Sequence, residues 1–237
     1  MIPIRDHNQT RRTPVVTWTL IGANLALFVW SMAFGPSNAE QIVMRFGVIP
    51  DVLVNGQWGF SRVDGGALGS VVTPFTSMFL HGGVLHLVSN MWFLHVFGDN
   101  VEDVLGRARY LAFYAVSGVG AAVGQVLVDP NSMVPMIGAS GAISGVLAGY
   151  MILFPHARIV TLVPIVIFIR FFDVPAAAFI ILWFALQLVL GYLSLGLLSE
   201  AGSGVAWFAH IGGFLVGLVT VKLFYRSPRG RRDRLFR

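Results

Sequence analysis

Long uninterrupted apolar stretches dominate the chain, and they predict membrane-spanning helices. A helix needs roughly 20 apolar residues to cross about 30 Å of hydrocarbon, because it rises about 1.5 Å per residue. Six stretches qualify, and they occupy residues 14–34, 82–101, 110–128, 138–157, 174–197 and 205–224. We therefore expect an all-α membrane protein whose six-span domain covers 14–224, with a polar leader at 1–13 and a basic tail at 225–237.

Two of the connections between these stretches are long. Residues 35–81 contain Trp58, Phe60 and several glycines. Aromatic rings are stable at the membrane–water interface, so we expect a long interfacial first loop. Residues 159–169, IVTLVPIVIFI, are apolar but too short to span and include Pro164, which predicts an interfacial or re-entrant piece. Counting that piece as a span would reverse the orientation of everything after it.

The composition excludes a soluble globular domain. The chain is 56% hydrophobic and 11% charged, with a mean hydropathy of +0.75, whereas soluble domains carry about 25% charged residues. The net charge of +5 comes from the end of the chain, because residues 222–237 hold seven basic residues and one acid. Basic residues directly after an apolar segment indicate a cytoplasmic anchor and not a nucleic-acid site.

Arginines also predict the orientation. Arg5, Arg11 and Arg12 precede the first span, and the basic tail follows the last one. Since positive residues stay on the cytoplasmic side, both termini belong inside and the number of spans is even. We expect a multi-pass protein of a prokaryotic cell membrane, since the chain is compact.

Polar residues recur at one depth of three different helices. With the N-terminus inside, spans two, four and six all begin near the outer face. His86 and Asn90 lie four residues apart near the start of span two, and hence on one helix face. Ser140 falls within the first turn of span four and His210 about one turn into span six. Buried polar groups in membrane helices usually face the bundle interior or a water-filled cavity.

Each of these residues also has a purely structural interpretation. A single membrane histidine often forms a helix-to-helix hydrogen bond, and a serine in a glycine-rich helix usually serves packing. Small residues spaced four apart allow close backbone approach, and they occur on span four and span six at Gly141, Gly145, Gly149, Gly213 and Gly217. The same packing could bring span four against span six, and Ser140 against His210.

Four motifs together resemble the rhomboid family of intramembrane serine proteases. They are GASG at 138–141, AHIGGFLVG at 209–217, HLVSN at 86–90 and GDNVEDVLG at 98–106. The resemblance implies the six-helix rhomboid bundle and the hydrolysis of peptide bonds in transmembrane protein substrates within the lipid bilayer. It implies no cofactor and no metal.

The resemblance also assigns roles to individual residues. Ser140 corresponds to the nucleophile and His210 to the general base, while Asn90 and His86 correspond to oxyanion donors. Structural positions of the motifs are Gly138, Gly141, Gly213, Gly217 and Glu102. Because span two begins near the outer face, Glu102 at its far end lies on the inner side, away from Ser140. There we expect it to brace helix ends. One turn after the serine, where some members carry an aromatic residue, this chain has Ser144.

The chemistry of these residues is consistent with acyl transfer. A serine hydroxyl reacts only when a base accepts its proton, and histidine suits that role near neutral pH. No Asp or Glu lies between residues 201 and 232, and Asp173 and Glu200 border span five at unknown reach. We therefore expect a Ser–His dyad and not a triad. Span five, with Trp183 and Phe184, is a candidate lateral gate against span two, although lipid-facing aromatic residues explain it equally well.

Other functions remain open alternatives. A catalytically inactive rhomboid-like chaperone or adaptor would bind transmembrane helices but would not need Ser140 and His210 at matched depth. A transporter predicts internal repeats and ionisable residues throughout the membrane, and none is evident. Metal-dependent hydrolysis is disfavoured because His81, His86 and His95 lack the four-residue spacing of a metal motif, and because the chain has no cysteine.

Overall fold

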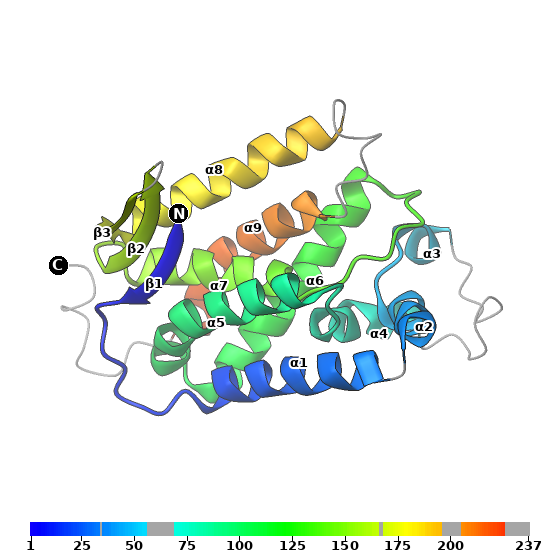
Figure 1. Ribbon diagram of the computed structural model, residues 1–237, viewed down its shortest axis with the longest axis horizontal. Coiled ribbons are helices and arrows are strands. Elements are labelled where there is room, and N and C mark those ends of the chain that lie inside the picture. The colour runs from blue at the N-terminus through cyan, green and yellow to red at the C-terminus, as the bar shows by residue number, and fades with distance from the viewer. Residues whose placement is uncertain (34, 56–68, 166–167, 196–204, 226–237) are drawn as a thin grey trace.

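The computed structural model describes residues 1–33, 35–55, 69–165, 168–195 and 205–225. The helices are α1 (Val15–Ala33), α2 (Pro36–Phe46), α3 (Pro50–Val54), α4 (Gly69–Thr76), α5 (Val84–Leu105), α6 (Arg107–Val128), α7 (Ser140–Leu153), α8 (Ala176–Ser194) and α9 (Trp207–Phe224), with a short 3-10 helix at Ser77–Phe79. The strands are β1 (Ile2–Asp6), β2 (Arg158–Ile165) and β3 (Phe168–Pro175). The long helices form a bundle, with the strands at one end and α2, α3 and α4 at the other (Figure 1).

Every predicted span contains a helix, but the helices differ in their ability to cross a membrane alone. Among the described residues, α1, α6, α8 and α9 are each long and apolar enough to span. A fifth candidate joins α4 and its 3-10 extension to α5 across a 92° bend. The several apolar helices make the chain a multi-pass integral membrane protein. The described residues therefore contain four or five candidate spans by length and composition.

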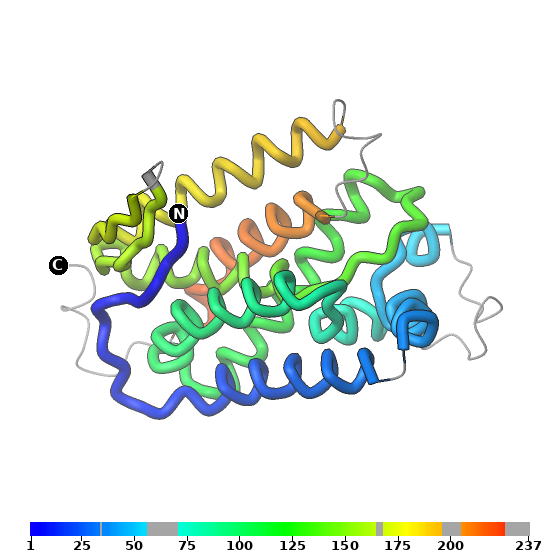
Figure 2. The backbone as a smooth tube through the Cα atoms, viewed as in Figure 1, coloured from blue at the N-terminus to red at the C-terminus, as the bar shows by residue number. Residues whose placement is uncertain are grey.

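Helix α7 is the exception to the span prediction. It has 14 residues, which corresponds to about 21 Å, because it begins at Ser140 and ends at Leu153 instead of filling 138–157. Eleven of its residues are buried, and it contacts α5, α6, α8 and α9. Figure 2 shows it enclosed by its neighbours. Irregular backbone is tolerated at membrane depth where it is buried in protein, so a helix enclosed on several sides can be short.

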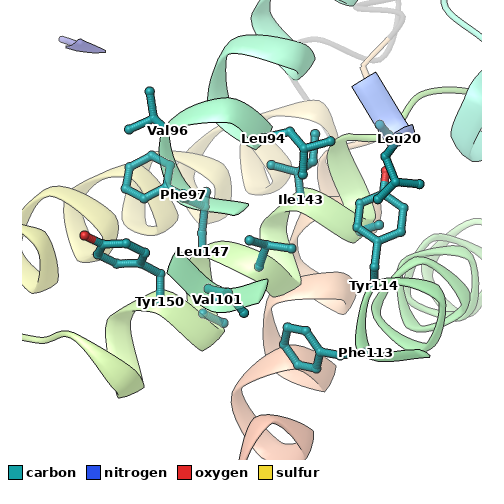
Figure 3. Packing of buried hydrophobic residues seen from close by; sticks show 14 of the residues in the cluster. Leu20, Leu94, Val96, Phe97, Val101, Phe113, Tyr114, Ile143, Leu147 and Tyr150 are labelled. Atoms are coloured by element: carbon teal, nitrogen blue, oxygen red, sulfur yellow. The ribbon is translucent and has the colours of Figure 1, made fainter. Parts of the chain in front are cut away.

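The hydrophobic core lies between α5, α6 and α7 (Figure 3). The Phe97 ring meets Tyr150 edge to face with centroids 5.1 Å apart, and it stacks on Phe179 of α8 at 6.0 Å. Leu94, Phe97, Leu147 and Tyr150 are fully shielded. These contacts hold α7 in place, and they thereby fix the position of its first residue, Ser140.

The prediction of an all-α protein is wrong at one end of the bundle. Strand β2 pairs antiparallel with β1, from Ile2 opposite Leu162 to Asp6 opposite Ile159, and with β3 on its other side. The segment 159–169, predicted as an interfacial or re-entrant piece, is therefore part of a β-hairpin. Its β-branched residues suit a strand, and Pro164 lies beyond the last pair with β1, where β2 has a free edge.

The predicted polar leader is tied down through β1. The Asp6 carboxylate accepts hydrogen bonds from Asn100 Nδ2 at 2.8 Å and from the Tyr150 hydroxyl at 2.5 Å. Burial raises the pKa of Asp6 to about 6, against the opposing hydrogen bond from Tyr150. His7 lies 2.9 Å from Asp173 of β3. These contacts join the first residues to α5, α7 and the hairpin.

The connection between α1 and α5, where we expected a long interfacial loop, is largely helical in the part that the structure describes. It contains α2, α3 and α4, while Trp58 and Phe60 lie outside the described residues. A β-bridge between Val48 and Met136 connects this loop to the segment that leads into α7. The first loop thereby supports the entry to the central helix.

Glu102, near the end of α5, caps the start of α1. Its buried carboxylate accepts hydrogen bonds from the backbone N–H of Val16 at 2.9 Å and of Thr17 at 2.8 Å. The Thr17 hydroxyl donates a third, also at 2.8 Å. The first N–H groups of a helix have no partner within it and carry a partial positive charge, so a buried carboxylate is stabilising there.

Candidate active site

Ser140 is the first residue of α7, and the local backbone determines where it points. Gly138 has φ +120°, a conformation that other residues rarely adopt, and its N–H donates to the Ser77 carbonyl at 2.9 Å. A Cβ atom at Gly138 would lie 2.7 Å from His86 Nε2. The glycine therefore turns the chain sharply into the helix and leaves room for the His86 ring beside it.

Glycines bring α9 against α7. A Cβ at Gly213 would collide with the Gly141 carbonyl oxygen, and one at Gly217 would collide with the backbone of Gly145. The two helices thus touch backbone to backbone at both levels. This close approach sets the distance between the first turns of the two helices.

Ser140 and His210 meet at the resulting junction. His210 lies in the first turn of α9, which begins at Trp207, and its Nε2 atom is 2.7 Å from Ser140 Oγ. This distance is within hydrogen-bond range for a nucleophile and its base. The two rows of small residues and the count of spans both predicted that these side chains could approach.

The other ring nitrogen of His210 has a partner that the sequence analysis missed. His210 Nδ1 lies 2.8 Å from Oε1 of Gln187 on α8, and Gln187 is only 5% exposed. Among the carboxylates near span five, neither of the two candidates is shown to orient the ring. Asp173, one of the two considered, pairs with His7 in the sheet, and Glu200 lies outside the described residues. A sequence signal did exist, since Gln187 is the one carboxamide in the apolar helix α8.

Two tryptophans flank the His210 ring. The centroid of Trp183, from α8, lies 6.1 Å away with the planes tilted by 37°. The centroid of Trp207 is also at 6.1 Å and nearly perpendicular, at 87°. Ser144, which occupies the position of an aromatic residue in some rhomboids, donates instead to the Ser140 carbonyl at 2.7 Å. The aromatic neighbours of the imidazole therefore come from α8 and α9, and Trp183 packs inward toward the site.

His86 and Asn90 lie on the same side of α5, next to this junction. Asn90 is buried, and its Nδ2 donates to the His86 carbonyl at 2.8 Å. A carboxamide nitrogen carries two hydrogens, so one of them remains for a ligand. The His86 ring packs edge to face on His81 with centroids 5.0 Å apart. His95, the third histidine near span two, lies against Trp18 instead, with ring centroids 5.1 Å apart and planes tilted by 42°.

A cavity of about 1110 Å³ connects these side chains. Its lining comes from α5 to α9 and from the segment that precedes α7, and it includes His86, Asn90, Ser140, Gln187 and His210. Such a volume exceeds the few hundred cubic ångströms of many small-ligand sites. Within the described ranges, no group of three or more His, Cys, Asp or Glu is arranged to hold a metal ion.

Comparisons with known proteins identify the family to which the chain is similar. A protein-family model, the Rhomboid domain, matches residues 68–227. The chain is 31% identical over 154 residues to the putative rhomboid protease YdcA of Bacillus subtilis, covering 63% of this chain and 68% of that protein. It is 27% identical over 236 residues to the rhomboid protease AarA of Providencia stuartii, covering 92% and 75% respectively.

A eukaryotic relative is matched over a smaller share of its own length. The mitochondrial rhomboid protein 1 of Saccharomyces cerevisiae is 29% identical over 169 residues, which cover 70% of this chain but only 45% of the yeast protein. The chain thus spans less than half of that relative. The family model covers well over half of this chain, including all four sequence motifs. The protein is therefore a member of the rhomboid family.

Proposed function

We propose that this chain is an intramembrane serine protease in which Ser140 and His210 form the reactive pair. The observation that carries the proposal is the 2.7 Å separation between Ser140 Oγ and His210 Nε2 inside a large cavity. A serine for which a histidine nitrogen is within reach can be activated as a nucleophile. Two of the relatives, YdcA and AarA, are themselves named as rhomboid proteases, which adds support.

The proposed reaction begins when His210 Nε2 accepts the Ser140 proton and the oxygen attacks a peptide carbonyl. The resulting oxyanion lies at the start of α7, where the first N–H groups of the helix have no partner within the helix. Asn90, through its second amide hydrogen, and His86 are the side-chain candidates for further donors. The protonated His210 then gives its proton to the leaving amine, and water hydrolyses the acyl-enzyme by the same base.

The substrate in this proposal is another transmembrane protein. A peptide bond in a stable helix is shielded by its own hydrogen bonds, so the segment that is cut must unwind, and Gly or Pro would favour this. We further propose six spans, with both termini in the cytoplasm of a prokaryotic cell. Helix α7 would then be the short fourth span, and Ser140 would face the outer side. The arginines before α1 and the basic residues after α9 support this orientation.

An activity-based probe tests the proposal directly. A fluorophosphonate should label the purified wild-type protein in detergent, and the label should disappear in Ser140→Ala and in His210→Ala. Cleavage of a model transmembrane substrate should disappear with it. Ser89→Ala is a matched control, because Ser89 also lines the cavity and its hydroxyl donates to the backbone carbonyl of His86, and it should label normally. Labelling that persists in Ser140→Ala would contradict the proposal. No labelling and no cleavage by a folded wild-type protein would favour the inactive, helix-binding alternative.

A further inference from the structure

We infer that Gln187 is a positioning residue that holds the proton of His210 on Nδ1, so that Nε2 is free to accept the proton of Ser140. This inference rests on the proposed function. It replaces the expected dyad with a chain of three side chains drawn from α7, α9 and α8. The third member is a neutral carboxamide and not a carboxylate.

The orientation of the Gln187 amide follows from its two neighbours. Its Nε2 lies 3.3 Å from the Trp183 carbonyl oxygen, which can only accept, so the NH₂ group must face that way. Its Oε1 then faces His210 Nδ1 at 2.8 Å. With the amide reversed, two carbonyl oxygens would oppose each other at Trp183. The backbone of α8 thereby fixes which atom of Gln187 meets the imidazole.

The proton of the imidazole follows from that orientation. A carbonyl oxygen accepts hydrogen bonds, so Nδ1 must carry the hydrogen, and a neutral imidazole has only one. Nε2 is then the lone-pair nitrogen, and this is the atom 2.7 Å from Ser140 Oγ. When Nε2 takes the serine proton, the imidazolium keeps its Nδ1 hydrogen bond to Gln187. That bond strengthens because its donor is now charged.

Packing on either side of Gln187 supports a fixed position. One turn before it, Phe184 stacks on Phe214 of α9, with centroids 4.1 Å apart and planes at 19°. One turn after it, Gly191 faces the side chains of Trp207 and Ile211. The carboxamide is therefore held between two contacts of α8 with the helix that carries His210.

Three variants separate positioning from general stability. Gln187→Leu removes the acceptor, and Gln187→Glu keeps an acceptor oxygen and adds a charge. Asn24→Leu is the control, because Asn24 is another buried carboxamide whose NH₂ bonds the carbonyl four residues earlier, in α1 and away from the cavity. Fluorophosphonate labelling rate, kcat and KM for a model substrate, and the pH–rate profile are measured for each.

We expect Gln187→Leu to lower the labelling rate and kcat by about 10- to 100-fold with little change in KM. The lost hydrogen bond matters most once the imidazole has become charged, which happens as the serine proton transfers and not when the substrate binds. Gln187→Glu should restore most of the rate at alkaline pH, while the acid limb of its profile moves up by about one pH unit or more. Asn24→Leu should match the wild type in kcat and pH profile. Equal kcat and pH profiles in wild type, Gln187→Leu and Gln187→Glu would overturn the inference.

Nitrogen-15 NMR of the ring tests the same claim without catalysis. The His210 signal, identified by its absence in His210→Ala, should show Nδ1 protonated and Nε2 unprotonated in the wild type, and Gln187→Leu should shift the ring toward the other tautomer. A wild-type ring protonated at Nε2 would overturn the inference even if the protein is an active protease. Conversely, a His210 ring protonated at Nδ1 in a protein whose Ser140 is not labelled would reject the protease proposal. The assignment of Gln187 as the residue that sets the tautomer would stand.

Discussion

The cap that Glu102 forms on α1 allows a quantitative prediction. Glu102 is 3% exposed, and it receives three hydrogen bonds from Val16 and Thr17. Glu102→Gln preserves the size of the side chain but removes the negative charge. It also turns one acceptor oxygen into an NH₂ group that faces backbone donors.

The cost of this change can be estimated from the contacts. A hydrogen bond to a charged group contributes about 1.5–3 kcal/mol, and a buried donor left without a partner costs about 1–3 kcal/mol. The favourable interaction of the charge with the helix start adds up to about 1 kcal/mol at ordinary sites. Because the remaining Gln oxygen still accepts some of these hydrogen bonds, we expect the free energy of unfolding to fall by about 3 kcal/mol. For a chain of this size that corresponds to a fall in Tm of about 6–12 °C.

Thermal unfolding in detergent followed by tryptophan fluorescence measures this loss. The chain has six tryptophans and no cysteine, so thiol-reactive dyes have no target. Asp103→Asn is the control, because it makes the same charge change at the next residue, where the carboxylate meets the Arg11 N–H at an exposed position. It should shift Tm by no more than about 2 °C. Equal shifts for the two variants, or a Glu102→Gln shift under about 2 °C, would refute the cap as a stabilising contact.

Two further predictions concern packing and pH. Gly213→Ala should destabilise the protein and reduce Ser140 labelling, because the new methyl group meets the Gly141 carbonyl. The control Gly22→Ala, where the methyl group has nothing within 4 Å, should be neutral or slightly stabilising. Similar Tm values for the two variants would contradict this prediction. The pKa of Asp6 is raised by burial to about 6 from 3.8, so the folded state binds that proton more tightly than the unfolded state. Its stabilising contribution is therefore complete below about pH 4 and is lost as the pH rises through about 6. The Tm of the wild type minus that of Asp6→Asn should therefore decrease as the pH rises from about 4 to 7. A difference that stays constant over this range would exclude Asp6 as the cause.

The parts of the molecule that depend on helix periodicity were accessible from the sequence. Apolar length predicted where the helices lie, and the expected even number of crossings predicted that Ser140 and His210 lie at one depth. The start of α7 was less accessible, because the backbone at Gly138 and the bridge from Val48 to Met136 determine it. An apolar stretch can be predicted from composition, whereas the residue at which a helix begins depends on such contacts.

The hairpin and Gln187 were missed for different reasons. Residues 159–169 are apolar throughout, so neither a strand nor a helix period is visible in them, and the first strand of the sheet is at the opposite end of the chain. Gln187 was missed because a neutral carboxamide carries no charge to mark it as a partner of the imidazole. A carboxamide is sufficient where the acceptor only has to select one tautomer.

The pairing of β1 with β2 has a consequence for biosynthesis. Ile2 pairs with Leu162 and Asp6 bonds Tyr150, so β1 cannot reach these partners until residues 150–162 have left the ribosome. Early crossings would insert while the amino-terminal strand is still unpaired, and its docking would close one end of the bundle late in assembly. Strand β1, although it precedes every helix described, would thus reach its native position after most of them.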